Sequence, residues 1–535
     1  MLSLFIEYIF LILIILALVM LAGKLRIAYP IVLVMGGLAL SFVSGFSNIT
    51  IDPEYVFFLF LPPLLYEAAW QTSWKEFWKW RRVISSFAFL IVILTSCVIA
   101  FTSSALIPGF TLALGFLLGG IISPPDAISA TTIMRQLKVP KSLVCIIEGE
   151  SLLNDASSLI IVRFAVVAII TGQFYFQDAA LSFFLVIILG CLIGIAVAWI
   201  FYCIHRWLPT TSSIDTILTL ITPYCMYYAA EQFHYSGVLA VVCGGLLLSS
   251  KRQQMLSYKS RIQGVNVWTN LVFVLNGLIF MLIGLQLRAV SKQLGEISVA
   301  KAIGYGLLIS AILIITRVLF TMGTSVFTRF ASRFITVADS NPGWKMPLIT
   351  GWAGMRGVVS LAAALSIPVV MSNGQPFPFR NLILFITFIV ILVTLVFQGL
   401  TLPWLVRKLA PEDKFTAIPE AKQEFIIQRK IARQSIKFLQ ARFKETGFDN
   451  KQVDNLFTKL ELEYSFFDRE FEEISLQDHQ SLQHYYGVYL DMLVQQRKLL
   501  AEMNRRSEFD EDLIRKYLSL TDLEELKVRE KLSKD

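Results

Sequence analysis

The stretch EGESLLND, residues 148–155, places three carboxylates and one asparagine inside an apolar segment that extends from residue 142 to residue 171. A charged side chain at the centre of a bilayer costs about 2.5–3.5 kcal/mol on insertion scales, and such groups usually serve a function. Glu148 is close enough to the start of the segment to be a helix-end residue. Glu150 and Asp155 lie deeper, so each of them needs a partner or a ligand.

Helical spacing divides these polar residues between two faces. Ser151 and Asp155 are four residues apart and share one face, as do Glu150 and Asn154. Glu150 and Asp155 are five residues apart, about 140° around the helix axis, so we do not expect one ligand to engage both. A hydroxyl and a carboxylate are hard oxygen donors suited to a small cation. We therefore expect Asp155, with Ser151 on its face, to bind a small cation or a proton, and Glu150 to form half of a buried ion pair.

The composition indicates a polytopic membrane protein rather than a soluble enzyme. Of the 535 residues, 56% are hydrophobic and only 16% are charged. The net charge of +8 does not indicate nucleic-acid binding, because the basic residues lie in short loops between apolar runs. The six cysteines and four histidines show no zinc-binding or redox spacing. We therefore expect neither an enzyme nor a bound cofactor.

Apolar windows of about 20 residues, the length of a membrane helix, predict an all-α fold with about thirteen spans. They lie at residues 4–22, 27–46, 54–70, 83–104, 110–134, 142–171, 179–204, 214–231, 236–250, 268–288, 300–327, 347–372 and 383–405. The first window lacks a basic leader and carries Glu7, which favours a retained span over a cleaved signal peptide. From residue 411 to residue 535 the chain is charged and amphipathic, which predicts a cytosolic helical domain after a membrane domain at residues 1–410.

The basic residues of the loops predict the orientation. With the N-terminus outside and the C-terminal domain in the cytoplasm, the inward loops hold 17 basic residues and the outward loops hold four, Arg288, Lys292, Lys301 and Arg380. This is a strong positive-inside bias. An incorrect number of spans would mix the two sets, so the bias supports an odd number of spans in a bacterial-type plasma membrane.

Two of the predicted spans are interrupted. The fifth contains Pro124 and Pro125 followed by Asp126, and a double proline removes two amide donors from a helix. The twelfth contains three glycines around Arg356, followed by Pro368. These breaks correspond if spans 1–6 and 8–13 are inverted repeats, and paired broken helices indicate a midplane site in transporters. Proline and glycine are also ordinary in membrane helices, but here both breaks carry a charge.

The remaining charges have alternative interpretations. Arg356 is the expected partner of Glu150, because either charge alone would be very unfavourable at the midplane. Arg317 is expected either to bind carbonyls of a broken helix or to have no role. Arg163 is expected either to have a functional role or to lie near the outer interface. Glu67, which follows Pro62 and Pro63, is either an interfacial charge or part of the ion path.

Five motifs together resemble the monovalent cation:proton antiporter family 1, which includes bacterial sodium/proton exchangers. They are FFLFLPPLLYEAA, PPDAISA, EGESLLNDASS, SGVLAVVCGGL and GWAGMRGVVSLAAAL, in that order along residues 1–410. The resemblance implies crossed broken helices, a homodimer and a core that moves against a dimerisation domain. It also implies that Asp155 binds the cation or the proton with help from Asn154 and Ser151, and that Glu150 and Arg356 form a structural ion pair.

The sequence departs from the family pattern at one ligand position. Many members have a threonine before the aspartate of the broken helix, and this chain has Pro125, whose carbonyl remains as a potential ligand. The choice between Na⁺ and K⁺ is therefore left open. Asn154 in place of an aspartate resembles the electroneutral branch of the family.

The sequence thus predicts an electroneutral Na⁺/H⁺ antiporter that works by alternating access and maintains pH and sodium levels. Asp126, at the start of a half-helix, would add negative potential to the site. The expected partners are Na⁺, with Li⁺ or K⁺ as alternatives, H⁺, membrane lipid and a second copy of the chain. Two alternatives stay open: a K⁺(Na⁺)/H⁺ antiporter of the same fold, and a channel or transport-dead sensor that signals through its tail.

Overall fold

The computed structural model describes residues 2–43, 53–135, 137, 139–172, 176–292, 294, 297–334, 337–339, 341–371, 374–411, 420–443, 451–473, 476–503 and 511–532. The regular secondary structure within these ranges is helical, with one isolated bridge between Val370 and Pro376 and no β-strand. It divides into two compact units, Met1–Asp413 and Lys414–Asp535.

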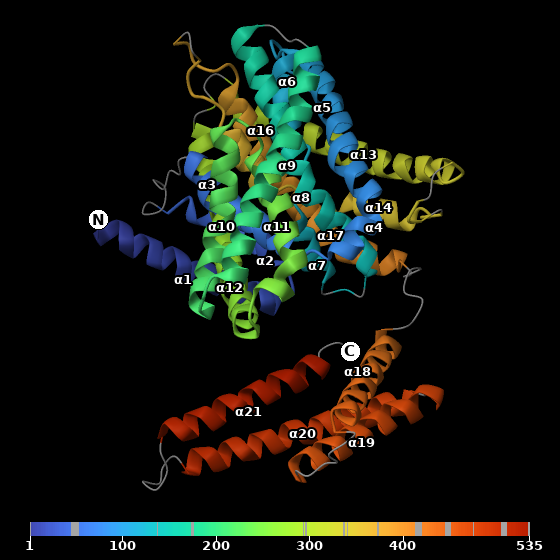
Figure 1. The fold of residues 1–535 in the computed structure, drawn as a ribbon. Helices are drawn as coiled ribbons and strands as arrows, with labels where there is room; N and C mark the ends of the chain where they lie inside the picture. Colours follow the sequence, from blue (N-terminus) through green and yellow to red (C-terminus); the bar gives the residue numbers. More distant parts are fainter. Residues whose placement is uncertain are drawn as a thin grey trace. The chain divides into compact units, whose positions relative to one another are not determined.

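The first unit contains all the long apolar helices (Figure 1). Its first part comprises α1 (Leu2–Leu25), α2 (Tyr29–Leu40), α3 (Pro53–Gln71), α4 (Trp74–Ser85), the π-helical turn η1 (Ser86–Ile91), α5 (Val92–Leu106), α6 (Leu112–Ile122), α7 (Ala127–Met134) and α8 (Lys141–Thr171). Its second part comprises α9 (Phe176–Trp207), α10 (Ser212–Gln232), α11 (Gly237–Met255), α12 (Tyr258–Lys292), α13 (Val299–Ala331), α14 (Lys345–Trp352), α15 (Val358–Leu365), α16 (Arg380–Val393), η2 (Thr394–Gln398) and α17 (Gly399–Leu409).

Each predicted apolar window overlaps one or more helices. Within the described ranges, seven helical stretches are long and apolar enough to cross a membrane. They are Trp74–Leu106, Leu112–Met134, Lys141–Thr171, Ser182–Trp207, Tyr258–Arg288, Val299–Phe330 and Arg380–Leu409. The all-α membrane fold is therefore confirmed, while the count of thirteen spans remains a prediction.

Close helix contacts in this unit depend on small residues. Helices α9, α10 and α11 lie side by side (Figure 1). Helices α2 and α12 approach so closely that a Cβ at Gly37 would lie 2.2 Å from the Met281 carbonyl oxygen. A Cβ at Gly284 would lie 2.2 Å from the Val34 carbonyl oxygen. Such backbone approach is typical of membrane helices, where van der Waals packing drives association.

Both predicted helix breaks are present. Helix α6 ends at Ile122 and α7 begins at Ala127, with the double proline between them. Helix α14 ends at Trp352 and α15 begins at Val358, with the glycine-rich segment between them. Each break therefore leaves carbonyl groups at the end of one half-helix and amide groups at the start of the next without intrahelical partners, and these groups need partners inside the bundle.

The second unit consists of amphipathic helices that pack in two pairs. Helix α18 (Glu420–Arg442) packs against α19 (Lys451–Glu473), and α20 (Leu476–Met503) packs against α21 (Glu511–Leu532). Arg497 of α20 forms ion pairs with Asp522, at 2.7 Å, and Glu525 of α21. These two carboxylates raise the pKa of Arg497, which is consistent with a solvated interhelical charge cluster.

We expect Gly284→Ala to lower the free energy of unfolding by about 1–3 kcal/mol, because the new methyl group overpacks the α2–α12 contact. Gly264→Ala, on the same helix, is the matched control because no atom lies within 4 Å of its added Cβ. Thermal unfolding in detergent measures both. Equal unfolding temperatures for the two variants would contradict the close contact.

Candidate functional site

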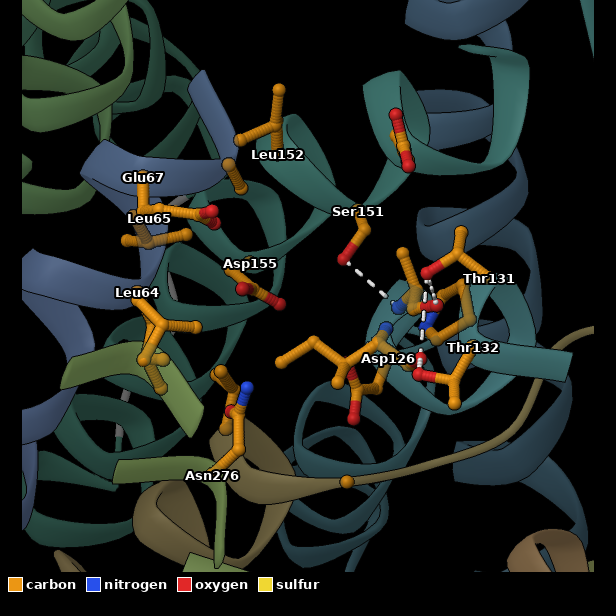
Figure 2. A pocket seen from close by; sticks show the side chains of 18 of the residues that line it. Leu64, Leu65, Glu67, Asp126, Thr131, Thr132, Ser151, Leu152, Asp155 and Asn276 are labelled. Atoms are coloured by element: carbon orange, nitrogen blue, oxygen red, sulfur yellow. Dashed lines mark hydrogen bonds between the residues drawn. The ribbon is translucent and has the colours of Figure 1, made fainter. Parts of the chain in front are cut away.

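A cavity of about 330 Å³ lies between α3, α7, α8 and α12, beside the first helix break. Its lining includes the carboxylates of Glu67, Asp126 and Asp155 and the hydroxyl of Ser151. Figure 2 shows the Asp155 side chain directed between Glu67 on one side and Ser151 on the other. The cavity therefore gathers oxygen atoms from helices that are distant in sequence.

Helix α8 contributes two of these groups from one face, as the four-residue spacing predicts. Asp155 is only 5% exposed, and no hydrogen bond to its carboxylate is present in the described part of the chain. The Ser151 hydroxyl lies nearby and accepts a hydrogen bond from the Ala127 amide at 3.2 Å. Asp155 is therefore a buried acid whose oxygens remain available to a ligand in the cavity.

Asp126 begins the second half of the first broken helix. Its Oδ1 atom accepts a hydrogen bond from the Ile128 amide at 2.9 Å and so caps α7. Its Oδ2 atom is buried without a partner among the described residues. The Asn154 side chain donates a hydrogen bond to the Pro125 carbonyl at 2.8 Å. Asn154 thus supports the break from α8, and the Pro125 carbonyl keeps one lone pair free.

The two breaks cross in direct contact. The Asp126 amide donates a hydrogen bond to the Met355 carbonyl at 2.7 Å, which joins the backbones of the two interrupted helices. Gly357 lies against the same residue, because a Cβ added there would lie 2.1 Å from Asp126 Oδ2. The crossed arrangement implied by the family resemblance is therefore present, and it holds Asp126 between the first residues of α7 and α15.

Arg356 satisfies the opposite ends of the half-helices. It is 1% exposed, and its guanidinium donates to the Ile122 carbonyl at 2.5 Å and to the Gly354 carbonyl. Ile122 is the last residue of α6, and Gly354 follows the end of α14. A cation is favourable at helix C-termini because the dipoles end there with partial negative charge. Arg356 therefore binds the two carbonyl ends, and Asp126 binds the amide end of α7.

The predicted ion pair is correct for Glu150 and wrong for its arginine. Both Glu150 carboxylate oxygens accept hydrogen bonds from Arg317 of α13, at 2.8 and 2.9 Å, and both side chains are buried. Arg317 was expected either to bind broken-helix carbonyls or to have no role, and Arg356 to pair with Glu150. The two arginines have the opposite partners from those predicted. The guanidinium of Arg356 is directed at the helix ends, whereas α13 places Arg317 opposite Glu150.

The other candidates differ in exposure and in whether they line the cavity. Arg163 is exposed and donates to the His234 carbonyl at 3.0 Å, outside the residues that line the cavity. Glu67 lines the cavity and accepts a hydrogen bond from Gln71. Sequence reasoning missed Asn276 of α12, which lines the cavity with its Oδ1 unpartnered among the described residues. An asparagine inside the apolar run LVFVLNGLIF was the available signal.

The cavity is lined by oxygen donors of several kinds. No group of three or more histidine, cysteine or acidic side chains with metal-binding geometry occurs among the described residues. The cavity offers carboxylate, hydroxyl, amide and backbone oxygens, which are the donors that small hard cations prefer. A carboxylate can also hold a proton, so both kinds of ligand fit Asp155.

Comparison with known proteins identifies what this arrangement is similar to. A family described as "Sodium/hydrogen exchanger, transmembrane" matches residues 9–408. Two proteins named "Sodium, potassium, lithium and rubidium/H(+) antiporter" are similar in sequence. The one from Bacillus pumilus is 32% identical over 79% of this chain and 64% of its own length. The one from Bacillus subtilis is 34% identical over 69% of this chain and 56% of its own length.

The matches to these two relatives thus span less than two thirds of the relatives' length. Among solved structures, the sodium proton antiporter of Methanocaldococcus jannaschii has a TM-score of 0.56 at 17% identity. That match covers 77% of this chain and 100% of the other. At this identity the similarity shows the fold alone.

We expect Glu150→Gln to lower the free energy of unfolding by about 3–5 kcal/mol, because it leaves the buried Arg317 without a counter-charge. Glu511→Gln is the control, since it removes an exposed carboxylate paired with Arg515 and should cost less than about 1 kcal/mol. Thermal unfolding of both purified variants provides the comparison. If Glu150→Gln unfolds like the control, the buried pair is not structural.

Proposed function

Because the chain belongs to the sodium/hydrogen exchanger family, we propose that it is an electroneutral antiporter that exchanges one Na⁺ for one H⁺ across the membrane. The observation that carries the proposal is Asp155, a buried carboxylate with no hydrogen-bond partner in the described chain that faces a cavity beside two crossed helix breaks. The family is one of transporters, so the cavity is a transport site and not a catalytic centre.

Asp155 would bind the cation and the proton in turn. A carboxylate with a bound proton and a carboxylate with a bound monovalent cation carry the same net charge, so the two loaded states are electrically equivalent. Ser151 would add a hydroxyl ligand, and the Pro125 carbonyl held by Asn154 would add a backbone ligand. Asp126 would hold the local potential negative while its own charge is balanced by the amide end of α7.

Neutral neighbours support the one-for-one stoichiometry. Asn154, next to Asp155 in the chain, is uncharged and fully buried. Glu150 is neutralised by Arg317, and Arg356 is bound to helix-end carbonyls. In this proposal Asp155 is the group that gains and loses charge during the cycle, which gives exchange without net charge movement.

The cation is the open choice within this proposal. We assign Na⁺ because a site of carboxylate and hydroxyl oxygens suits a small hard cation. The names of the two Bacillus relatives add potassium, lithium and rubidium, so a K⁺(Na⁺)/H⁺ antiporter is the second candidate. Direct comparison of the ions in a flux assay decides between them.

The arrangement in the membrane completes the proposal. We infer about thirteen spans with inverted repeats in the plasma membrane, an external N-terminus and a cytoplasmic C-terminal domain, on the basis of the distribution of loop charges. We also infer a homodimer, an exchanger domain at residues 1–410 and a helical domain at residues 411–535. Alternating access would move the cavity between the two membrane faces.

We expect Asp155→Asn to abolish cation-driven proton flux in proteoliposomes, because an amide can neither exchange a proton nor neutralise a cation. Na⁺, Li⁺ and K⁺ are each added to vesicles that hold a pH gradient. Glu76→Gln, which removes a half-buried carboxylate outside the cavity, should retain the flux of the unmodified protein. Flux that persists in Asp155→Asn would assign the binding group to another residue.

Wild-type flux should not change when a membrane potential is imposed. One uncompensated charge per cycle would couple to about 2.3 kcal/mol per 100 mV, which is easily detected with a potassium–valinomycin clamp. A rate that follows the potential would rule out one-for-one exchange. A wild-type protein that dissipates the gradient without any added cation would support the channel alternative, and one with no flux would support the sensor.

Because proton and cation compete for one carboxylate, we expect the apparent KM for the cation to rise as the pH falls. In the range where Asp155 is mostly protonated, one competing proton gives about a tenfold rise in KM per pH unit with an unchanged maximum rate. Initial rates measured at several pH values and cation concentrations test this. A slope near two in the logarithmic plot would indicate two protons per cation.

A further inference from the structure

The ion pair between Arg135 and Glu148 occupies the solvent end of the cavity. Arg135 Nη2 lies 3.1 Å from Glu148 Oε1, and both residues belong to the cavity lining. Their side chains are 61% and 26% exposed, whereas Asp155, farther along the same lining, is 5% exposed. This gradient of exposure places the pair where the cavity meets solvent and Asp155 at its inner end.

The pair also joins the two helices that carry the inner site. Glu148, Ser151 and Asp155 are spaced by three and four residues on α8, so they lie along one face of that helix. Arg135 follows the last residue of α7, and Asp126 precedes the first. A cation that travels from solvent to Asp155 between these helices therefore passes the pair.

The charges of the lining make this position electrostatically distinct. Among the described residues that line the cavity, four are acidic, Glu67, Asp126, Glu148 and Asp155, and Arg135 is the single basic one. Acidic linings concentrate cations, and a guanidinium at the mouth opposes them. Arg135 also engages one oxygen of Glu148, the acidic residue that an arriving cation would meet on this face of α8.

We propose that the Arg135–Glu148 pair is an electrostatic gate that sets the apparent affinity for cations arriving through this mouth. Glu148 attracts the cation when its bond to Arg135 opens, and Arg135 returns to Glu148 after the cation has moved on to Asp155. The inference rests on the proposed antiport function and assigns two positioning residues to it. By the loop charges, this mouth faces the cytoplasm.

The test measures initial rates in everted membrane vesicles, in which the cytoplasmic face is exposed to the medium. Arg135→Gln should lower the KM for the cation by about threefold, and Glu148→Gln should raise it by about threefold, the size expected for one exposed charge. The maximum rates should stay unchanged, because neither residue reaches the inner site. The double variant Arg135→Gln/Glu148→Gln should return close to the unmodified KM.

KM shifts of opposite sign distinguish an electrostatic gate from a purely structural ion pair. Loss of a structural ion pair would change the KM in the same direction in both single variants. Glu76→Gln and Lys79→Gln are matched controls, because they disrupt an ion pair on α4 at 4.0 Å that is outside the cavity lining. The KM shifts should shrink when choline chloride raises the ionic strength. They should be absent in right-side-out vesicles, where the cation is offered to the other face.

Two results would overturn the gate. KM shifts of the same sign in both single variants, or shifts equal to those of the Glu76 and Lys79 controls, would leave the antiporter proposal standing and remove only the gate. Absence of cation-driven flux in the unmodified protein would remove the antiporter proposal and the gate together. The two failures are therefore distinguishable in one set of vesicles.

Discussion

The crossing of the two broken helices is the constraint on which the rest of the membrane unit depends. Inside a bilayer every backbone amide and carbonyl must be satisfied by protein or by water in a cavity, and two breaks at one depth leave several without helical partners. The backbone bond from Asp126 to Met355 joins the breaks. Arg356 takes the carbonyl ends and Asp126 caps an amide end. Removal of either charge would leave helix-end groups without these side-chain partners.

This use of Arg356 explains why Glu150 has its own partner. Its guanidinium donates through Nε and Nη1 to the carbonyl ends of two half-helices, whereas the Glu150 carboxylate lies opposite Arg317 of α13. The buried Glu150–Arg317 pair therefore forms separately, between α8 and α13. Its cost of desolvation is offset only while both partners are present. Asp155 differs from Glu150 in that its carboxylate is buried beside the cavity without a paired cation among the described residues.

The cavity shows how a rigid frame and an open binding group coexist. Asn154 and Ser151 hold the first break through Pro125 and Ala127, so the backbone near Asp155 is fixed from α8 itself. The Asp155 carboxylate, on the same helix, remains available to exchange ligands. Toward solvent the cavity lining becomes more exposed and more charged. Electrostatics therefore governs how a cation approaches the site, and burial governs its binding at Asp155.

The sequence by itself determined the helical membrane fold and the two breaks, because hydropathy, proline and glycine act locally along the chain. It also placed Ser151 and Asp155 on one face, since helical spacing is a local property. Only the tertiary structure decided which arginine meets Glu150, because Arg317 and Arg356 are both buried cations and their directions depend on how α13 and the second break pack. Asn276 joined the cavity for the same reason: a contact between distant helices is set by packing, which no single segment encodes.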